Sequence, residues 1–226
     1  MILKISGIGI ALLSVFTVFT AEGSDFIDTS MPDKLITYGV RVGLNTSNQT
    51  SPSKSVNLDS WGTGFDAGVV VDLNFRDFFA IQPGFFFESR SHNYSYVDNA
   101  DRLLDVSEYG HTRSYWFNIP LLASFRINPA NSLKVSIDAG PQFGFGIGGS
   151  DKGTFEDETG LTIPYDDGYF DIRKKFVLSF KMGAGIRYAD HYYFGIHYQA
   201  GTGDVYKNGI EGGNHKAWTF TLGYDF

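Results

Sequence analysis

The chain has 226 residues, a formal net charge of −7 and no cysteine. The lack of cysteine excludes a disulfide scaffold, a thiolate metal site and a cysteine nucleophile. The acidic balance, without any basic stripe, argues against a nucleic-acid partner. Aromatic residues make up 16% of the chain, a high share that is typical of the aromatic girdles of membrane β-barrels.

The N-terminal residues predict a secretory signal peptide over residues 1–23. Lys4 precedes a long apolar run that ends in small residues, so we expect cleavage after Ala21 or Gly23. Residues 24–34 are polar and contain a proline, which predicts a short periplasmic lead-in without regular structure. The remaining chain, from residue 35 to 226, carries the folded domain.

Eight segments of this domain alternate bulky apolar residues with small or polar ones, which predicts strands with one apolar face. They are Ile36–Asn45, Phe65–Asn74, Phe79–Arg90, Tyr115–Arg126, Leu133–Phe145, Phe176–Tyr188, Tyr192–Gln199 and Trp218–Phe226. The connections alternate between four long loops and three tight turns. An even strand number with this asymmetry predicts an all-β fold, an eight-stranded antiparallel transmembrane β-barrel with up-and-down meander topology. Pro83 lies inside the third segment, where we expect a bulge.

The placement of charge predicts which face meets lipid. The bulky positions at the middle of the strands carry no charged residue, and a basic side chain facing mid-bilayer lipid would cost roughly 2–4 kcal/mol. The opposite face carries the charges and predicts an interior network of Arg41, Asp66, Asp72, Glu88, Arg90, Arg126, Lys134, Asp138, Lys181, Arg187 and Asp225. Inward glycines leave space for these long side chains.

Arg126 and Lys134 flank one tight turn, so we expect them to lie opposite each other on the inner wall. Each then needs a carboxylate nearby, and Asp72 and Asp225 are the candidates because they lie near the same end. An eight-stranded barrel is just wide enough to be filled by side chains, so an open pore is not expected.

Several segments resemble the PorT-like outer-membrane β-barrel proteins of Gram-negative bacteria. They are Ile81–Phe87, Ile119–Leu122, Ala139–Pro141, Gly183–Ile186 and Leu222–Phe226. The resemblance implies an eight-stranded barrel delivered to the outer membrane, where lipid surrounds it. It also implies that the last strand is recognised by the barrel-assembly machinery through Trp218, Phe220, Leu222, Tyr224 and Phe226. The family's namesake serves a secretion system, and the resemblance implies no single activity.

The leading functional hypothesis is a non-enzymatic structural or interaction protein of the cell envelope. We expect a monomer with both termini in the periplasm and four loops exposed outside. Candidate contacts for a protein or glycan partner are the loop aromatics Tyr94, Tyr96, Tyr109, Phe155, Tyr165, Tyr169 and Phe170, although these rings could equally pack onto the barrel rim. No cofactor or metal is expected, because the acids of the third loop do not follow EF-hand spacing.

Two alternatives stay open. An outer-membrane hydrolase could use His92, His111 or His215 with Asp98 or Asp101, although no spacing fixes a nucleophile beside a base. A secreted soluble β-barrel could bind a small apolar ligand if the bulky face lined a cavity.

Overall fold

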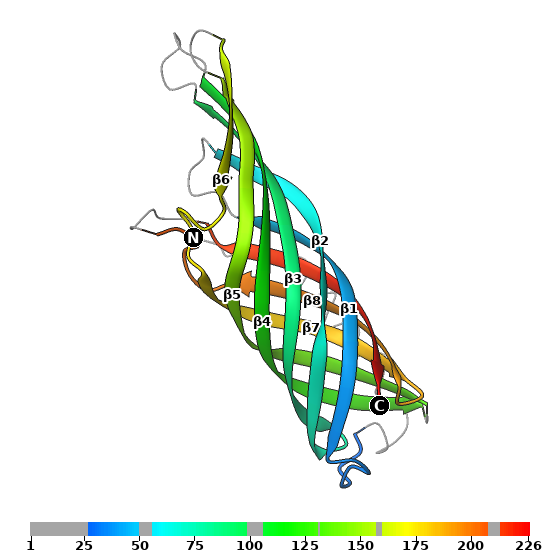
Figure 1. Ribbon diagram of the computed structural model, residues 1–226. Helices are drawn as coiled ribbons and strands as arrows, with labels where there is room; N and C mark the ends of the chain where they lie inside the picture. The colour runs from blue at the N-terminus through cyan, green and yellow to red at the C-terminus, as the bar shows by residue number, and fades with distance from the viewer. Residues whose placement is uncertain (1–26, 50–55, 99–105, 131, 157–159, 208–212) are drawn as a thin grey trace, which may run out of the picture.

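The computed structural model describes residues 27–49, 56–98, 106–130, 132–156, 160–207 and 213–226 (Figure 1). The predicted signal peptide and the first residues of the lead-in lie outside these ranges. In the described ranges there is no helix that is both long and apolar enough to cross a membrane.

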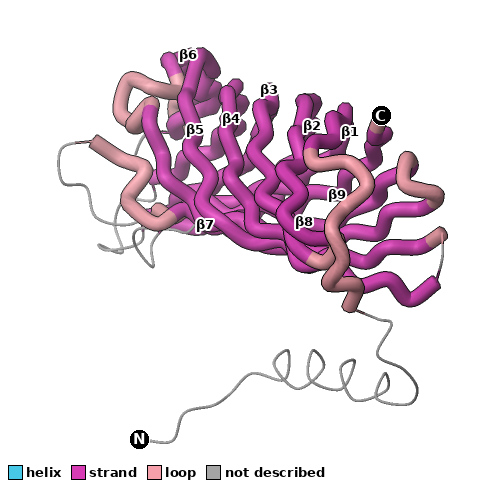
Figure 2. Tube along the Cα trace, turned by 90° about the horizontal axis from the view of Figure 1, so that it is seen from below, coloured by secondary structure: helices cyan, strands magenta, loops and turns pink. Residues whose placement is uncertain are grey.

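The described residues form nine antiparallel strands. They are β1 (Ile36–Gln49), β2 (Val56–Arg76), β3 (Phe79–Asp98), β4 (Val106–Ala130), β5 (Leu133–Glu156), β6 (Thr162–Gly168), β7 (Phe176–Tyr188), β8 (Tyr192–Gly201) and β9 (His215–Asp225). Eight of them, all except β6, form a closed ring in which each strand pairs with its neighbours and β1 pairs with β9. The predicted up-and-down barrel is therefore confirmed (Figure 2).

The two faces of the wall are divided as the charge pattern predicts. Bulky side chains point away from the barrel, for example Leu44 at 69% and Leu222 at 60% exposed, whereas Asp72 inside is 1% exposed. The apolar face is thus available to acyl chains, and the charged face is sealed inside. This orientation contradicts the alternative of a soluble barrel whose bulky face lines a ligand cavity.

The two ends of the barrel differ. At one end, which we call the turn end, tight turns join β2 to β3, β4 to β5 and β7 to β8. At the opposite end, the extended end, β3, β4 and β5 run far beyond the ring (Figure 1). Residues predicted as long loops therefore form strands in part, and β6 pairs with the extension of β5. The alternation does not reveal these extensions, because backbone pairing needs no apolar face once a strand has left the lipid.

Two local expectations have different outcomes. The register between β2 and β3 is unshifted across Pro83, since Val70 pairs with Gly84 and Leu73 with Ile81, so the expected bulge is absent. The expectation that inward glycines leave space is confirmed at Gly223, where a β-carbon would collide with the Arg41 side chain.

Candidate functional site

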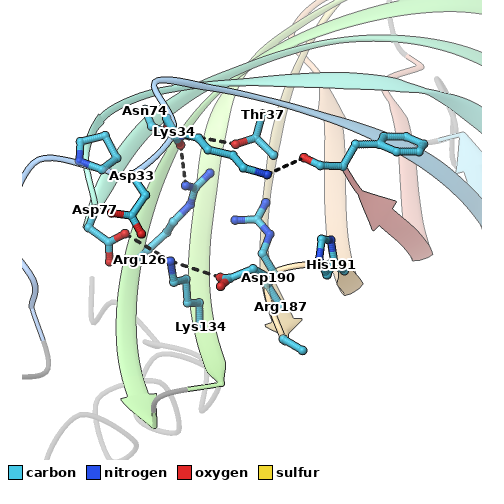
Figure 3. Close-up of a pocket in the computed structure, with 13 residues that line it drawn as sticks. Asp33, Lys34, Thr37, Asn74, Asp77, Arg126, Lys134, Arg187, Asp190 and His191 are labelled. Carbon is cyan, nitrogen blue, oxygen red and sulfur yellow. Dashed lines mark hydrogen bonds and ion pairs between the residues drawn. The ribbon is translucent and has the colours of Figure 1, made fainter.

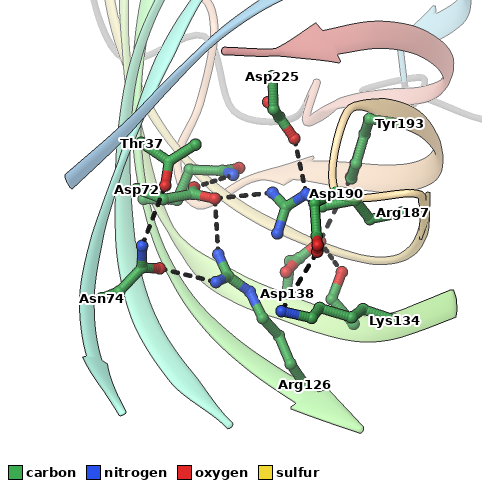
Figure 4. Close-up of polar contacts among 12 residues, drawn as sticks. Thr37, Asp72, Asn74, Arg126, Lys134, Asp138, Arg187, Asp190, Tyr193 and Asp225 are labelled. Carbon is green, nitrogen blue, oxygen red and sulfur yellow. Dashed lines mark hydrogen bonds and ion pairs between the residues drawn. The ribbon is translucent and has the colours of Figure 1, made fainter. Parts of the chain in front are cut away.

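Asp72 is the centre of a buried ion-pair network near the turn end (Figure 4). Its Oδ2 atom accepts hydrogen bonds from Nη2 of Arg126 and Nη2 of Arg187, both at 2.7 Å. Its Oδ1 atom accepts a third bond from Nε2 of Gln82 at 2.5 Å. A carboxylate this deeply buried is stable as an ion only with such compensation.

Asp225 extends the network toward β1. Its two oxygens lie 2.6 Å from Nη2 of Arg41 and 2.6 Å from Nε of Arg187. Arg187 thus bridges both carboxylates. These five residues are a subset of the eleven predicted interior charges, and from here on the name interior network refers to them alone: Arg41, Asp72, Arg126, Arg187 and Asp225.

Of the two predicted carboxylate partners, Asp72 is confirmed for Arg126, and neither is a partner of Lys134. Arg126 lies across from Ser136 rather than Lys134, because the turn lies between Ala130 and Leu133, so that Arg126 is four residues from the end of β4 and Lys134 is one residue from the start of β5. Lys134 therefore sits nearer the turns, and its ammonium lies 3.2 Å from Asp77 and 3.3 Å from Asp190. Its side chain is 28% exposed, so this pairing is partly screened by water.

The other predicted interior residues are buried, but they form separate groups. Arg90 donates two hydrogen bonds of 2.9 Å to Glu88 and lies over the Trp116 ring. Asp138 accepts hydrogen bonds from Ser136 and His197. The remaining two, Asp66 and Lys181, are also buried, and Lys181 lies over the ring of Phe86.

A pocket of about 280 Å³ opens at the turn end, above the interior network (Figure 3). Its lining includes the basic residues Lys34, Arg126, Lys134 and Arg187 and the acidic residues Asp33, Asp77 and Asp190. The lead-in supplies one wall, because Asn74 donates from its side chain to the Lys34 carbonyl oxygen at 2.9 Å. We call this cavity the turn-end pocket.

An aromatic plug fills the barrel near the extended end. Trp116 packs edge-to-face on Phe170 with ring centroids 5.1 Å apart, and Phe170 packs the same way on Tyr169 at 5.0 Å. Val177 completes the cluster. Arg173 lies over Tyr169, and its Nη1 donates to Asp151 at 2.8 Å, which fixes the segment that carries these rings.

Beyond the plug, the extensions of β3, β4 and β5 join β6 in a sheet, which we call the projecting sheet (residues 93–98, 106–112, 151–156 and 162–168). Tyr165 donates to Oε1 of Glu108 at 2.6 Å, and Tyr94 donates to Oδ1 of Asp151 at 2.7 Å. Burial, together with the hydrogen bond to Glu108, raises the pKa of the Tyr165 hydroxyl, which stays protonated as a donor.

The predicted loop aromatics fall into three groups. Tyr109 and Phe155 are exposed on the projecting sheet, at 55% and 37%. Tyr94 and Tyr165 are partly buried and hydrogen-bonded within it. Tyr169 and Phe170 are buried in the plug, where a partner cannot reach them. The side chain of Tyr96 lies outside the described part of the chain.

Sequence reasoning missed two exposed apolar residues and one plug residue. Leu161 and Ile163, at 60% and 47% exposed, lie in a segment predicted to be a loop. Trp116 could have been found, because it is a large ring on the strand face that also carries Asn118, Ser124 and Arg126.

The histidines considered for hydrolysis are close enough to interact electrostatically, His92 with His111 and with His215, but each has its own surroundings. His92 contacts the hydroxyl of Thr112 at 2.8 Å and is buried, and His111 contacts Asn93 at 2.6 Å. His215 is buried at the start of β9. The side chain of Asp98 and the whole of Asp101 lie outside the described residues. Within the described ranges, no three His, Asp or Glu side chains are grouped so that they could hold a metal ion.

The described lipid-facing positions of the last strand form one continuous apolar row. Trp218, Phe220, Leu222 and Tyr224 alternate with inward residues along β9, and Phe226 follows them. All five are exposed on the barrel surface. Their predicted role as an assembly signal stays a prediction.

Comparison with known proteins relates the chain to membrane barrels. Residues 26–207 match the family model described as "Outer membrane protein beta-barrel domain". No curated protein matches the chain in sequence.

Similar solved structures include three small outer-membrane barrels. Ail of Yersinia pestis is 11% identical, with 85% of this chain and 100% of that chain covered and a TM-score of 0.42. OprG of Pseudomonas aeruginosa is 13% identical, with coverage of 88% and 99% and a TM-score of 0.38. The outer membrane enzyme PagL is 11% identical, with coverage of 80% and 98% and a TM-score of 0.34. Identities and TM-scores this low do not transfer a ligand or an activity.

Proposed function

Because the chain belongs to the outer membrane protein β-barrel domain family, we propose that it acts in the outer membrane as an interaction protein without catalytic activity. The projecting sheet holds the partner, and the barrel anchors that sheet in the membrane. In this proposal the turn end and both termini face the periplasm, and the projecting sheet faces outward, as the long connections of bacterial barrels do.

The observation that carries the proposal is the set of apolar side chains left exposed beyond the lipid. Tyr109, Phe155, Leu161 and Ile163 are all more than one-third exposed on or beside the projecting sheet. Apolar groups on the barrel wall are covered by acyl chains, but these four lie past the end of the ring. Phe155 and Ile163 are cross-strand partners on one face of the projecting sheet, with Leu161 close by in sequence, whereas Tyr109 pairs with Thr154 and lies on the other face. Neighbouring exposed apolar side chains are typical of binding surfaces, so the face that carries Phe155 and Ile163 is the proposed contact.

The filled interior supports the same proposal. The interior network near the turn end and the aromatic plug near the extended end occupy the space that a transported solute would need. Residues that bind a substrate in the lumen of a transporter must be reachable, whereas Asp72 and Trp116 are 1% and 2% exposed. A role in secretion, like that of the namesake of the PorT-like family, would place the partner in a secretion machinery.

Site-specific photo-crosslinking on intact cells tests this proposal. A photoreactive phenylalanine analogue replaces Leu161 or Ile163 in the full chain, and Met182 on the lipid-facing wall serves as the matched control. We expect the same discrete adduct from both sheet positions and none from the control. The absence of any adduct at the two sheet positions, in protein shown to be folded by its heat-dependent gel mobility, would contradict the proposal.

A further inference from the structure

On the outside of the barrel, basic side chains follow the apolar rows where strands leave the lipid-facing band toward the extended end. Lys216 is two residues from Trp218 in β9, and Arg113 is two residues from Tyr115 in β4. Side chains two residues apart along a strand share a face, so both bases point outward, as the two aromatic residues do. Arg113 is exposed, and Lys216 is partly exposed.

A third basic residue lies at the entry of β7. Lys174 comes two residues before Phe176, the first lipid-facing residue of that strand. Lys174 is exposed, whereas its neighbour Arg173 is buried, so the lysine side chain lies on the outside. We call these three residues the basic belt: Arg113, Lys174 and Lys216.

The described protein does not neutralise the basic belt. None of its three residues forms an ion pair with another residue of the described ranges. The cross-strand partners of Arg113 and Lys216 are all neutral: Ser91, Ser150, Asn48 and Ala200.

The charges of the adjoining connections leave the rim positive. The described segments 169–175 and 202–207 carry two acids, Asp171 and Asp204, and two further lysines, Lys175 and Lys207. Arg173, the remaining base there, is matched by Asp151. With the basic belt, the sum is five bases against two acids (5 − 2 = +3). The other described acids of the projecting sheet lie beyond the level of Arg113, farther from the lipid.

The belt lies where lipid headgroups meet a membrane barrel. Aromatic residues such as Trp218 and Tyr115 mark the interface between acyl chains and headgroups, and long basic side chains beside them reach into the headgroup layer. Lysine and arginine bind phosphate groups through charge-assisted hydrogen bonds.

We propose that the basic belt binds the phosphate groups of a lipid packed against the barrel wall, and that this lipid is the phosphate-bearing glycolipid of the outer leaflet. The choice of leaflet rests on the proposed function, which places the extended end outside. Each basic residue near an anionic membrane surface strengthens the attraction about fivefold.

Quenching of tryptophan fluorescence by brominated lipids tests this inference. Trp218, beside Lys216, is 42% exposed to lipid, whereas Trp116 is 2% exposed inside the barrel. The background variant Trp61→Phe removes the other lipid-facing tryptophan of the chain. This full-length protein is placed in phosphatidylcholine vesicles that contain brominated phosphatidic acid or the same fraction of brominated phosphatidylcholine. We expect several-fold preferential quenching by the phosphatidic acid, and unlabelled diphosphoryl lipid A should restore the fluorescence by competition.

Charge variants in this background locate the contact. Lys216→Gln should lower the preference about fivefold, and the triple variant with Arg113→Gln and Lys174→Gln should abolish it. Lys152→Gln removes an exposed charge that is matched by Asp166 on the projecting sheet, and should leave the preference unchanged. Heat-dependent gel mobility shows that each variant is folded.

Equal quenching by the two brominated lipids, or an unchanged preference in the folded triple variant, would overturn the inference. A preference with which lipid A does not compete would overturn the assignment to the outer-leaflet glycolipid. The cross-linking positions Leu161 and Ile163 are not part of the basic belt. Loss of the lipid preference with intact adducts therefore overturns this inference alone, and loss of the adducts with an intact lipid preference overturns only the proposed partner site.

Discussion

Replacing Asp72 by asparagine tests whether the interior network stabilises the barrel. Asp72 is paired with two arginines at 2.7 Å each, and its side chain is 2% exposed. In Asp72→Asn the three arginines of the network face one carboxylate instead of two. Removing one partner from a buried ion pair is destabilising by about 3–5 kcal/mol, because the remaining charge keeps its desolvation cost. The two arginines share this carboxylate, so we expect the upper part of that range.

The free energy of unfolding, measured by urea titration of the protein in lipid vesicles, gives this difference directly. Heat-dependent gel mobility should show the same order of stability. Asp166→Asn is the matched control, because its ion pair with Lys152 joins side chains that are 62% and 60% exposed, and such pairs contribute about 0–1 kcal/mol. Equal free energies of unfolding for Asp72→Asn and the wild type would refute the reasoning.

Three further predictions concern the turn, the inward glycines and the filled interior. Ala189 has a φ of 51° at the turn between β7 and β8, so Ala189→Gly should raise the free energy of unfolding by about 1 kcal/mol. Ala184→Gly inside β7 should lower the free energy of unfolding. The reverse order would argue against strain at the turn. Gly223→Ala should be destabilising by about 1–3 kcal/mol, because the added β-carbon meets Arg41. Gly148→Ala, where the added β-carbon meets open space, should be tolerated in the same urea titration. Equal losses in the free energy of unfolding for the two variants would speak against crowding by Arg41. The mid-barrel cavity beside Arg41 has a volume of about 20 Å³, which is room for about one water. Planar bilayers that contain the protein should therefore show no sustained channel currents. Stable currents would mean that the interior opens.

The barrel could be predicted from the sequence because two physical demands act on the same residues. Lipid excludes charge from one face of each strand, and the narrow interior requires small residues beside long ones on the other. Leu222 and Gly223 illustrate both demands in adjacent positions, the first exposed to lipid and the second leaving space for Arg41. The alternation of positions along the strands was enough to place nine of the eleven predicted interior charges at buried positions, whereas Lys134 and Arg187 are partly exposed.

The extended end could not be predicted in the same way, because neither demand acts there. The segment Thr162–Gly168 contains a proline and two adjacent aspartates and has no apolar alternation, yet it forms β6 by pairing with β5. The partners of Lys134 were also missed, since they depend on the exact position of the turn between Ala130 and Leu133, which residue types do not reveal.

The central claim is that the bulky positions face acyl chains and the charged positions face the interior. Because the chain has no cysteine, single spin labels can be placed by Phe220→Cys, Thr221→Cys and Leu222→Cys in β9. Electron paramagnetic resonance in lipid vesicles then measures the collision rate of each label with oxygen, which concentrates in the acyl region. The account predicts high oxygen collision rates at positions 220 and 222 and a low rate at 221. A high rate at 221 with low rates at its two neighbours would contradict it.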